Sequence, residues 1–224
     1  PTGSGLGTRR GSLISGSLTS KHHNLVFYGG TQVCSHMTVI LAIDSWAEYA
    51  VLQSEAHWKW TLEYGNKLET RPQYTPTDCF ETFPFPEVLT GLDDIGKRYY
   101  EHRQKTVQYL EEGLTDAYNR FHDPDETSTD IVELRHLHVV MDQAVNAAYG
   151  WQDINLGHGF HETKQGIRFT ISEAARREAL DRLLALNHQR HAEEVAATAT
   201  QSTATPARRG RKRKDTVGQW ALDF

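Results

Sequence analysis

Length, composition and charge exclude several protein classes before any motif is considered. The sequence has 224 residues, of which 38% are hydrophobic and 24% charged, and its formal net charge is −5. This length suits one ordinary domain or two small ones, and no apolar run approaches the ~20 residues of a membrane span. The first residue is Pro1 and no signal peptide is recognisable. We therefore expect a fragment of a cytoplasmic protein that makes no membrane contact.

The first part of the chain is expected to change from linker to strands to a helix. Residues 1–19 are rich in Gly, Ser and Thr, which favours a linker. Two β-branched runs within residues 24–44 predict paired strands. Apolar residues then recur at steps of three and four over residues 45–64, which predicts a helix with Ser45 as N-cap and Gly65 at its end.

The next segment, residues 66–87, contains four prolines and is predicted to be irregular. Within it, residues 74–86 carry four aromatic side chains in thirteen positions. A loop with so much apolar surface does not stay in water, so we expect it to be pressed against another surface.

The second half of the chain is expected to be mainly helical. Three amphipathic helices are predicted, over residues 92–111, 114–121 and 128–150. A glycine-containing loop at residues 151–169 and a helix opened by Ser172 follow. Residues 196–224 are predicted to be a disordered, basic tail. The fold class is therefore α+β, with a small β-rich N-terminal part followed by a mainly α-helical bundle.

Residue types that could bind a metal or act in catalysis give little support for an active site. Among the twelve histidines, the closest cluster is formed by His158 and His161 together with Glu162. No histidine follows Glu162 at the spacing that a zinc protease requires, so that signature is absent. We favour hydrogen-bonded loop histidines over a structural metal. Cys34 and Cys79 are too few for a disulfide scaffold and too far apart for a zinc knuckle. No nucleophile elbow or phosphate-binding loop occurs, so no catalytic residue is assigned.

Two features of the C-terminal tail suggest partners. Six cations lie within seven residues and would seek the phosphates of DNA, although a solubilising tail is the alternative; they are Arg208, Arg209, Arg211, Lys212, Arg213 and Lys214. Gln219, Leu222 and Phe224 are spaced as in short peptides that dock on the bacterial sliding clamp, although chance similarity is the alternative.

Residues 74–86 resemble a hallmark segment of the large Type IIG/IIL restriction–modification adenine methyltransferases. Further stretches resemble the same family in the same order, at residues 44–54, 112–124, 141–151 and 157–163. The resemblance covers about residues 20–195, and five collinear matches are more specific than any single motif.

The resemblance implies a division of labour within a longer enzyme. In that family, S-adenosylmethionine binds a catalytic half, and an Asn-Pro-Pro-Tyr/Phe motif receives a flipped adenine for N6 methylation. This sequence has no Asn-Pro-Pro, so we expect no cofactor here and a missing N-terminal methyltransferase part as a partner. Residues 20–86 would be the end of the target-recognition domain, and residues 87–195 a helical segment that buttresses it. The aromatic loop would either join the recognition domain to the rest of the enzyme or fill the core of this region.

Double-stranded DNA is the partner that the resemblance implies. Loops on a rigid sheet can reach base edges, while Lys and Arg supply charge for phosphates. The residues expected to contact DNA are Ser20, Lys21, His22, His23, Arg71 and Gln73. The alternative function is a non-enzymatic helical adaptor that docks on protein partners such as the sliding clamp.

Overall fold

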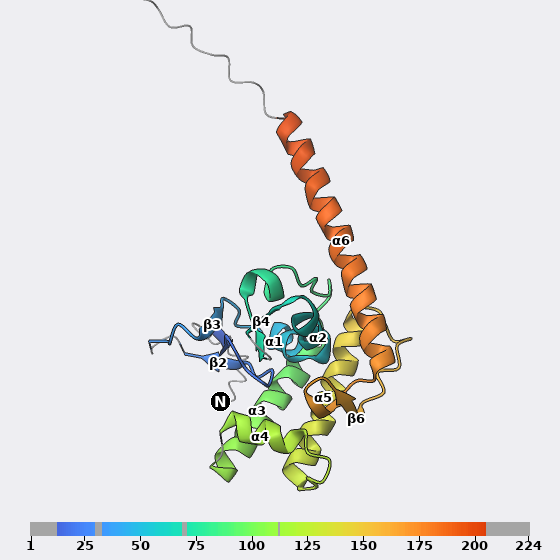
Figure 1. Cartoon of the computed structure of the whole chain (residues 1–224). Coiled ribbons are helices and arrows are strands. Elements are labelled where there is room, and N and C mark those ends of the chain that lie inside the picture. Colours follow the sequence, from blue (N-terminus) through green and yellow to red (C-terminus); the bar gives the residue numbers. More distant parts are fainter. Residues whose placement is uncertain (1–12, 30–32, 69–70, 112, 205–224) are drawn as a thin grey trace, which may run out of the picture. The chain divides into compact units, whose positions relative to one another are not determined.

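The computed structural model describes residues 13–29, 33–68, 71–111 and 113–204 (Figure 1). The basic run at residues 208–214 and the peptide containing Gln219, Leu222 and Phe224 lie outside this range. The described residues up to Asn187 form one compact unit, and residues 188–204 form a second unit that is the end of the last helix. Strands at the start and helices thereafter give the α+β fold that the sequence predicts.

A three-stranded antiparallel sheet opens the fold. It consists of β1 (Leu13–Ser17), β2 (Val26–Tyr28) and β3 (Thr38–Leu41), in the order β2-β1-β3. The central position of β1 corrects the expectation of a linker over residues 1–19. Ile14 pairs with Phe27 on one side and Leu41 on the other, and its side chain is fully buried. The sequence did not reveal this strand, because its two apolar residues are adjacent and do not alternate with polar ones. The strand is stabilised by pairing with a neighbour on each side.

Two helices replace the single helix expected over residues 45–64. They are α1 (Trp46–Gln53) and α2 (Glu55–Tyr64), and Ser54 between them has an extended backbone. The Asp142 carboxylate accepts the backbone N–H of Glu55 at 2.8 Å and so caps α2 from outside the helix. Ser45 is the N-cap of α1, since its Oγ accepts from the Glu48 N–H, and Gly65 ends α2, both as predicted.

The segment at residues 66–87 is more ordered than expected. It forms a hairpin of β4 (Asn66–Leu68) and β5 (Arg71–Gln73), followed by a short π-helix, η1 (Pro76–Phe80). Tyr74 and Phe83 are buried in the core, and Phe80 and Phe85 pack against it. The Tyr149 hydroxyl donates to the Pro84 carbonyl at 2.9 Å. The aromatic loop thus fills the core of this unit, which is the second of the two alternatives drawn from the sequence.

The predicted helices of the second half are present. They are α3 (Leu92–Leu110), α4 (Leu114–Phe121), α5 (Thr129–Ala148) and α6 (Glu173–Ala204). Two expectations fail here. A hairpin of β6 (Gly159–Thr163) and β7 (Gly166–Thr170) occupies part of the expected loop at residues 151–169, and α6 continues through residues 196–204, where a disordered tail was expected.

One hydrophobic core joins the sheet to the helices. It includes Ile14 of β1, Tyr49 of α1, Tyr99 of α3, Leu134 of α5 and Leu183 of α6, all fully buried. Figure 1 shows α1 and α2 at the centre of this unit, between the sheet and α5. Among the described residues, no helix combines the length and the apolar character needed to cross a bilayer.

Candidate nucleic-acid interface

Two of the segments predicted to contact DNA lie side by side. Residues 20–25 connect β1 to β2 and follow directly on Thr19, which forms an isolated antiparallel bridge with Gln73 of β5. The Tyr74 N–H donates to the Leu18 carbonyl at 2.8 Å. The chain positions near residues 20 and 72, far apart in sequence, are therefore held together by backbone pairing.

A small pocket lies where these segments meet α2. Ser20, His23 and Asn24 line one side of it, and Trp58, Thr61 and Tyr74 line another. Its volume of about 20 Å³ is close to the space needed by a single water. A nucleobase does not fit into it, so contact with DNA would fall to the side chains that surround it.

The structure places the predicted residues at different depths. Lys21 and Arg71 are exposed, and Ser20, His23 and Gln73 are half-buried. His22 retains only 3% of its surface. The two cations of the set that were expected to meet phosphates therefore face solvent.

Hydrogen bonds hold the 20–25 segment against the helices. The Lys21 ammonium donates to the Asn119 Oδ1 at 3.3 Å, and the His22 Nε2 lies 3.1 Å from the same oxygen. The His23 ring bonds the Leu52 carbonyl and stacks on Trp58, with ring centroids 5.0 Å apart. Sequence reasoning missed Asn119, since nothing in the sequence pairs a residue with one 98 positions away.

Burial makes the two histidines neutral. Desolvation lowers the pKa of His22 to about 4 and that of His23 to about 4. At neutral pH each ring therefore carries a single N–H, which fits one hydrogen bond to Asn119 or to the Leu52 carbonyl. Both rings are thus suited to fixing the segment rather than to supplying positive charge.

A buried ionic cluster lies where α2 meets α5. Glu55 binds the Lys59 ammonium at 2.8 Å, and its Oε1 lies 3.5 Å from the His138 Nε2. Asp142 bonds the His158 Nε2 at 2.7 Å. Burial alone would raise the pKa of Glu55, but Lys59 and His138 outweigh it and hold the pKa well below its usual range. The cluster joins α2 to α5.

The histidines first considered as metal ligands are hydrogen-bonded in the structure. His158 bonds Asp142, as described above, and the His161 Nε2 lies 2.8 Å from the Gly157 carbonyl oxygen. Within the part of the chain that the structure describes, no group of three or more His, Cys, Asp or Glu side chains is placed to hold a metal ion.

Comparison with known proteins shows what this region is similar to. Residues 15–87 match the family model of the MmeI target recognition domain. The fold is similar to that of the Type IIL restriction–modification enzyme MmeI solved in complex with DNA, with a TM-score of 0.59 and 17% sequence identity. The similarity covers 80% of this chain and 21% of the MmeI chain, so this chain spans about a fifth of that protein. A comparison with curated proteins found no match. Residues 15–87 are therefore similar to the MmeI target recognition domain, and the fold of the chain is similar to that of about a fifth of the MmeI chain.

Proposed function

We propose that this chain recognises double-stranded DNA for a site-specific restriction–modification enzyme that methylates adenine at N6. The observation that carries the proposal is the match of residues 15–87 to the MmeI target recognition domain. The neutral His22 and His23 rings and the paired backbone near Gln73 make the 20–25 segment a fixed support. Such a support suits DNA reading, because specific contacts need side chains held in a defined place.

Lys21 and Arg71 would make the first contacts. Both are exposed, and both extend from the paired region formed by Thr19 and Gln73. Lysine suits a phosphate, whereas arginine can bind a phosphate or donate two hydrogen bonds to a guanine in the major groove.

The chemical step would belong to another part of the enzyme. The sequence contains no Asn-Pro-Pro, the motif that the adenine methyltransferases use for the flipped base. S-adenosylmethionine would accordingly bind the methyltransferase part, and this chain would deliver the choice of DNA sequence.

Salt dependence of DNA binding tests the proposal. Anisotropy of a labelled duplex is measured over a salt series with the full chain and with a version in which the six cations of residues 208–214 are replaced by Gln. This second version separates the folded surface from the basic run. We expect log affinity to fall as log salt rises in both versions. Lys21→Ala and Arg71→Ala should each make this negative slope less steep by about 0.9, if each cation contacts one phosphate.

Lys97→Ala is the matched control. It removes one exposed positive charge, and the Lys97 side chain is 54% exposed on α3. Binding that is absent, or that does not depend on salt once the basic run is neutralised, would contradict the proposal. An equal change in slope for Lys97→Ala and Lys21→Ala would contradict the surface assigned here.

A further inference from the structure

Arg103 is a buried cation whose position calls for an explanation. Its side chain lies in the middle of α3 and is 0% exposed. None of the ion pairs between described residues includes it, and the rings of Tyr49, Tyr99 and Tyr100 surround its guanidinium at 5.3–5.9 Å. Burying a charge without a carboxylate partner costs several kcal/mol, which only good hydrogen bonds and favourable ring contacts offset.

The hydrogen bonds of Arg103 lead to the segment proposed to contact DNA. One guanidinium nitrogen donates to the Leu25 carbonyl, and the other donates to the Gln53 Oε1 at 3.2 Å and to the Tyr118 hydroxyl at 3.1 Å. Gln53 in turn accepts the Leu25 N–H at 3.0 Å and donates to the His23 carbonyl at 2.7 Å. Both backbone polar groups of Leu25 are therefore held by side chains of α1 and α3.

Asn119 holds the preceding part of the same segment from α4. Its single side-chain oxygen accepts from Lys21 at 3.3 Å and lies 3.1 Å from the His22 Nε2. His22 also stacks on Tyr118 and on His122, with ring centroids 5.7 and 5.4 Å apart. Tyr118 is hydrogen-bonded to Arg103 and directly precedes Asn119 in α4. Arg103 and Asn119, the two anchors of the segment, therefore belong to one connected network.

We infer that Arg103 and Asn119 are positioning residues that set the conformation in which Lys21 and its neighbours meet DNA. Both residues lie outside the 15–87 target-recognition segment, in α3 and α4. The helical part of the chain would thus contribute to the choice of DNA sequence without contacting DNA. This inference rests on the proposed function, because it assigns a conformational role toward the same surface.

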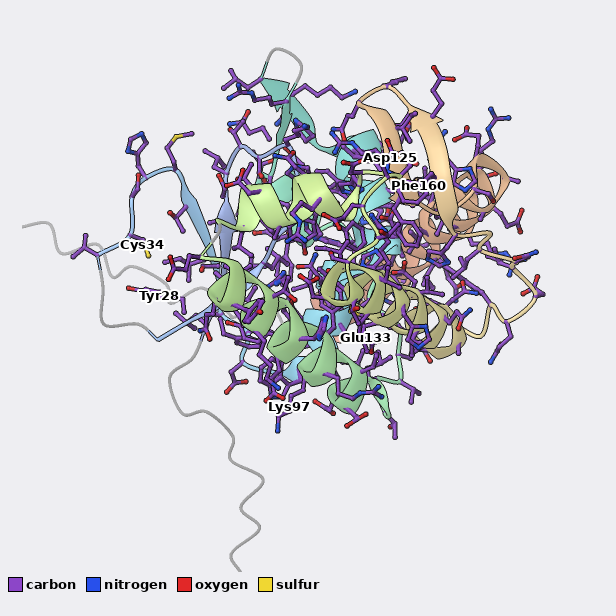
Figure 2. The ribbon with its side chains drawn as sticks, turned by 90° about the horizontal axis from the view of Figure 1, so that it is seen from below. Tyr28, Cys34, Lys97, Asp125, Glu133 and Phe160 are labelled. Atoms are coloured by element: carbon purple, nitrogen blue, oxygen red, sulfur yellow. The ribbon has the colours of Figure 1, made fainter. Side chains whose placement is uncertain are left out.

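The test compares four variants of the full chain with the unmodified one. Asn119→Ala removes the exposed anchor. Arg103→Met removes the buried anchor, and Arg103→Lys keeps its charge but not its shape. Lys97→Ala removes a charge from the outer side of the same helix, where Figure 2 shows Lys97 at the periphery. Each variant is examined by thermal unfolding, by hydrogen exchange of peptides covering residues 18–28, and by its affinity for a duplex enriched from a randomised library relative to a scrambled duplex.

For Asn119→Ala we expect a melting temperature close to that of the unmodified chain. We also expect faster exchange over residues 18–28 and at least a 10-fold lower ratio of specific to non-specific affinity, with non-specific affinity retained. Arg103→Lys is expected to keep more of the ratio than Arg103→Met. Lys97→Ala is expected to leave both the exchange and the ratio unchanged.

Two results would overturn the inference. One is an Asn119→Ala chain with unchanged exchange and an unchanged affinity ratio. The other is a parallel loss of specific and non-specific affinity together with a lower melting temperature, since a purely structural role lowers both in proportion to the folded fraction. If the unmodified chain prefers no duplex, the proposed function fails, and the exchange measurement still decides whether Asn119 and Arg103 fix residues 20–25.

Discussion

Arg135 shows how one side chain can join two helices. Its guanidinium donates to the backbone carbonyls of Arg120, Phe121, Asp123 and Glu126 at 2.7–3.0 Å, so it satisfies the end of α4 and the turn that leads to α5. Such carbonyls lack partners within the helix itself. The same residue stacks beneath Phe160, with the guanidinium carbon 4.9 Å from the ring centroid.

Replacing Arg135 is expected to destabilise the fold. Arg135→Ala removes the side-chain donor from all four carbonyls, of which those of Arg120 and Asp123 keep a backbone N–H donor. We expect a loss of about 2–4 kcal/mol in the free energy of unfolding, measured by urea denaturation. Arg177→Ala is the control, because Arg177 is 71% exposed and pairs only with Glu173. We expect it to cost less than about 1 kcal/mol. Similar losses for the two variants would argue against the capping role.

For single residues, the sequence predicts features that depend on near neighbours in the chain and misses contacts between residues far apart in the chain. The caps Ser45 and Gly65 were recognisable, because capping depends on residues within one turn. The bonds from Lys21 to Asn119 and from Arg103 to Leu25 were not, since they join residues 98 and 78 positions apart. Burial of His22 was equally hidden, because residue type alone does not tell whether a histidine is a surface ligand or a packed ring.

The crossing of α1 and α3 depends on a glycine within a helix. A Cβ at Gly96 would lie 2.4 Å from the Trp46 carbonyl oxygen and 3.2 Å from the Ala50 Cβ. Helix propensity favours alanine over glycine by about 1 kcal/mol, so the two effects oppose each other. The steric clash with the backbone oxygen outweighs the gain in helix propensity, because the backbone of α1 cannot move without disturbing the core.

Gly96→Ala is therefore expected to destabilise the fold by about 1–3 kcal/mol in urea denaturation, against the direction of helix propensity. Gly29→Ala is the comparison, since no atom lies within 4 Å of its Cβ position. A Gly96→Ala chain as stable as the original would show that α1 and α3 do not cross this closely.

Among the elements, the amphipathic helices and the strands within residues 24–44 were predictable, whereas β1 and the β6–β7 hairpin were not. The helices α3, α4 and α5 carry apolar stripes that extend over several turns, which gives a clear period. β1 has two apolar residues, and the β6–β7 hairpin follows a glycine-containing stretch that looks like a loop. The break at Ser54 required a carboxylate from α5, which no local pattern could reveal.

Four ionisable groups lie together deep inside the fold. Glu55, Lys59, His138 and Asp142 are all less than a tenth exposed, and they link α2 to α5. Removing one member leaves a neighbouring buried charge without a partner. The cluster therefore makes the junction between the two parts of the chain sensitive to single substitutions.

Glu55→Gln tests this junction. We expect a loss of about 3–5 kcal/mol in the free energy of unfolding, since Lys59 loses its carboxylate partner and His138 loses one of its two carboxylate neighbours. Glu101→Gln is the matched control, because its carboxylate is 50% exposed and lies 3.9 Å from the Lys97 ammonium; we expect a change below about 1 kcal/mol. If the two substitutions cost the same, the cluster does not hold the junction.

Acid is expected to weaken the fold below neutral pH. Burial lowers the pKa of His22 to about 4, of His23 to about 4 and of His122 to about 2, and it holds the pKa of His57 well below its usual range. Their unfolded pKa is about 6.5, so the unfolded state binds more protons between pH 6.5 and 4, and stability falls as pH falls through that window. His138 acts in the opposite direction. Burial would lower its pKa, but Asp142 and Glu55 raise it, so its contribution is lost as pH rises.

Urea midpoints at pH 7.5, 6.0 and 5.0 measure this balance. We expect the midpoint to decrease toward pH 5.0, because four lowered pKa values oppose one raised value. His122→Phe should reduce that decrease. A midpoint that stays constant or rises toward pH 5.0 would mean that these four histidines are accessible to protons in the folded chain.

The five collinear stretches of the sequence predicted the same family that the match of residues 15–87 and the similar fold indicate. They could not tell that the aromatic loop fills the core, or that α3 and α4 hold residues 20–25, because both depend on packing between distant segments.

The central claim is that duplex DNA meets the surface formed by residues 20–25 and the β4–β5 hairpin. Amide chemical shifts of the ¹⁵N-labelled full chain, recorded as duplex DNA is added, test it most directly. We expect the largest changes at residues 19–25 and 66–73, and little change near Glu133 and Phe160, which Figure 2 places on α5 and the β6–β7 hairpin, away from Tyr28. Changes confined to α5 and that hairpin, or no changes in the described residues at all, would contradict the claim.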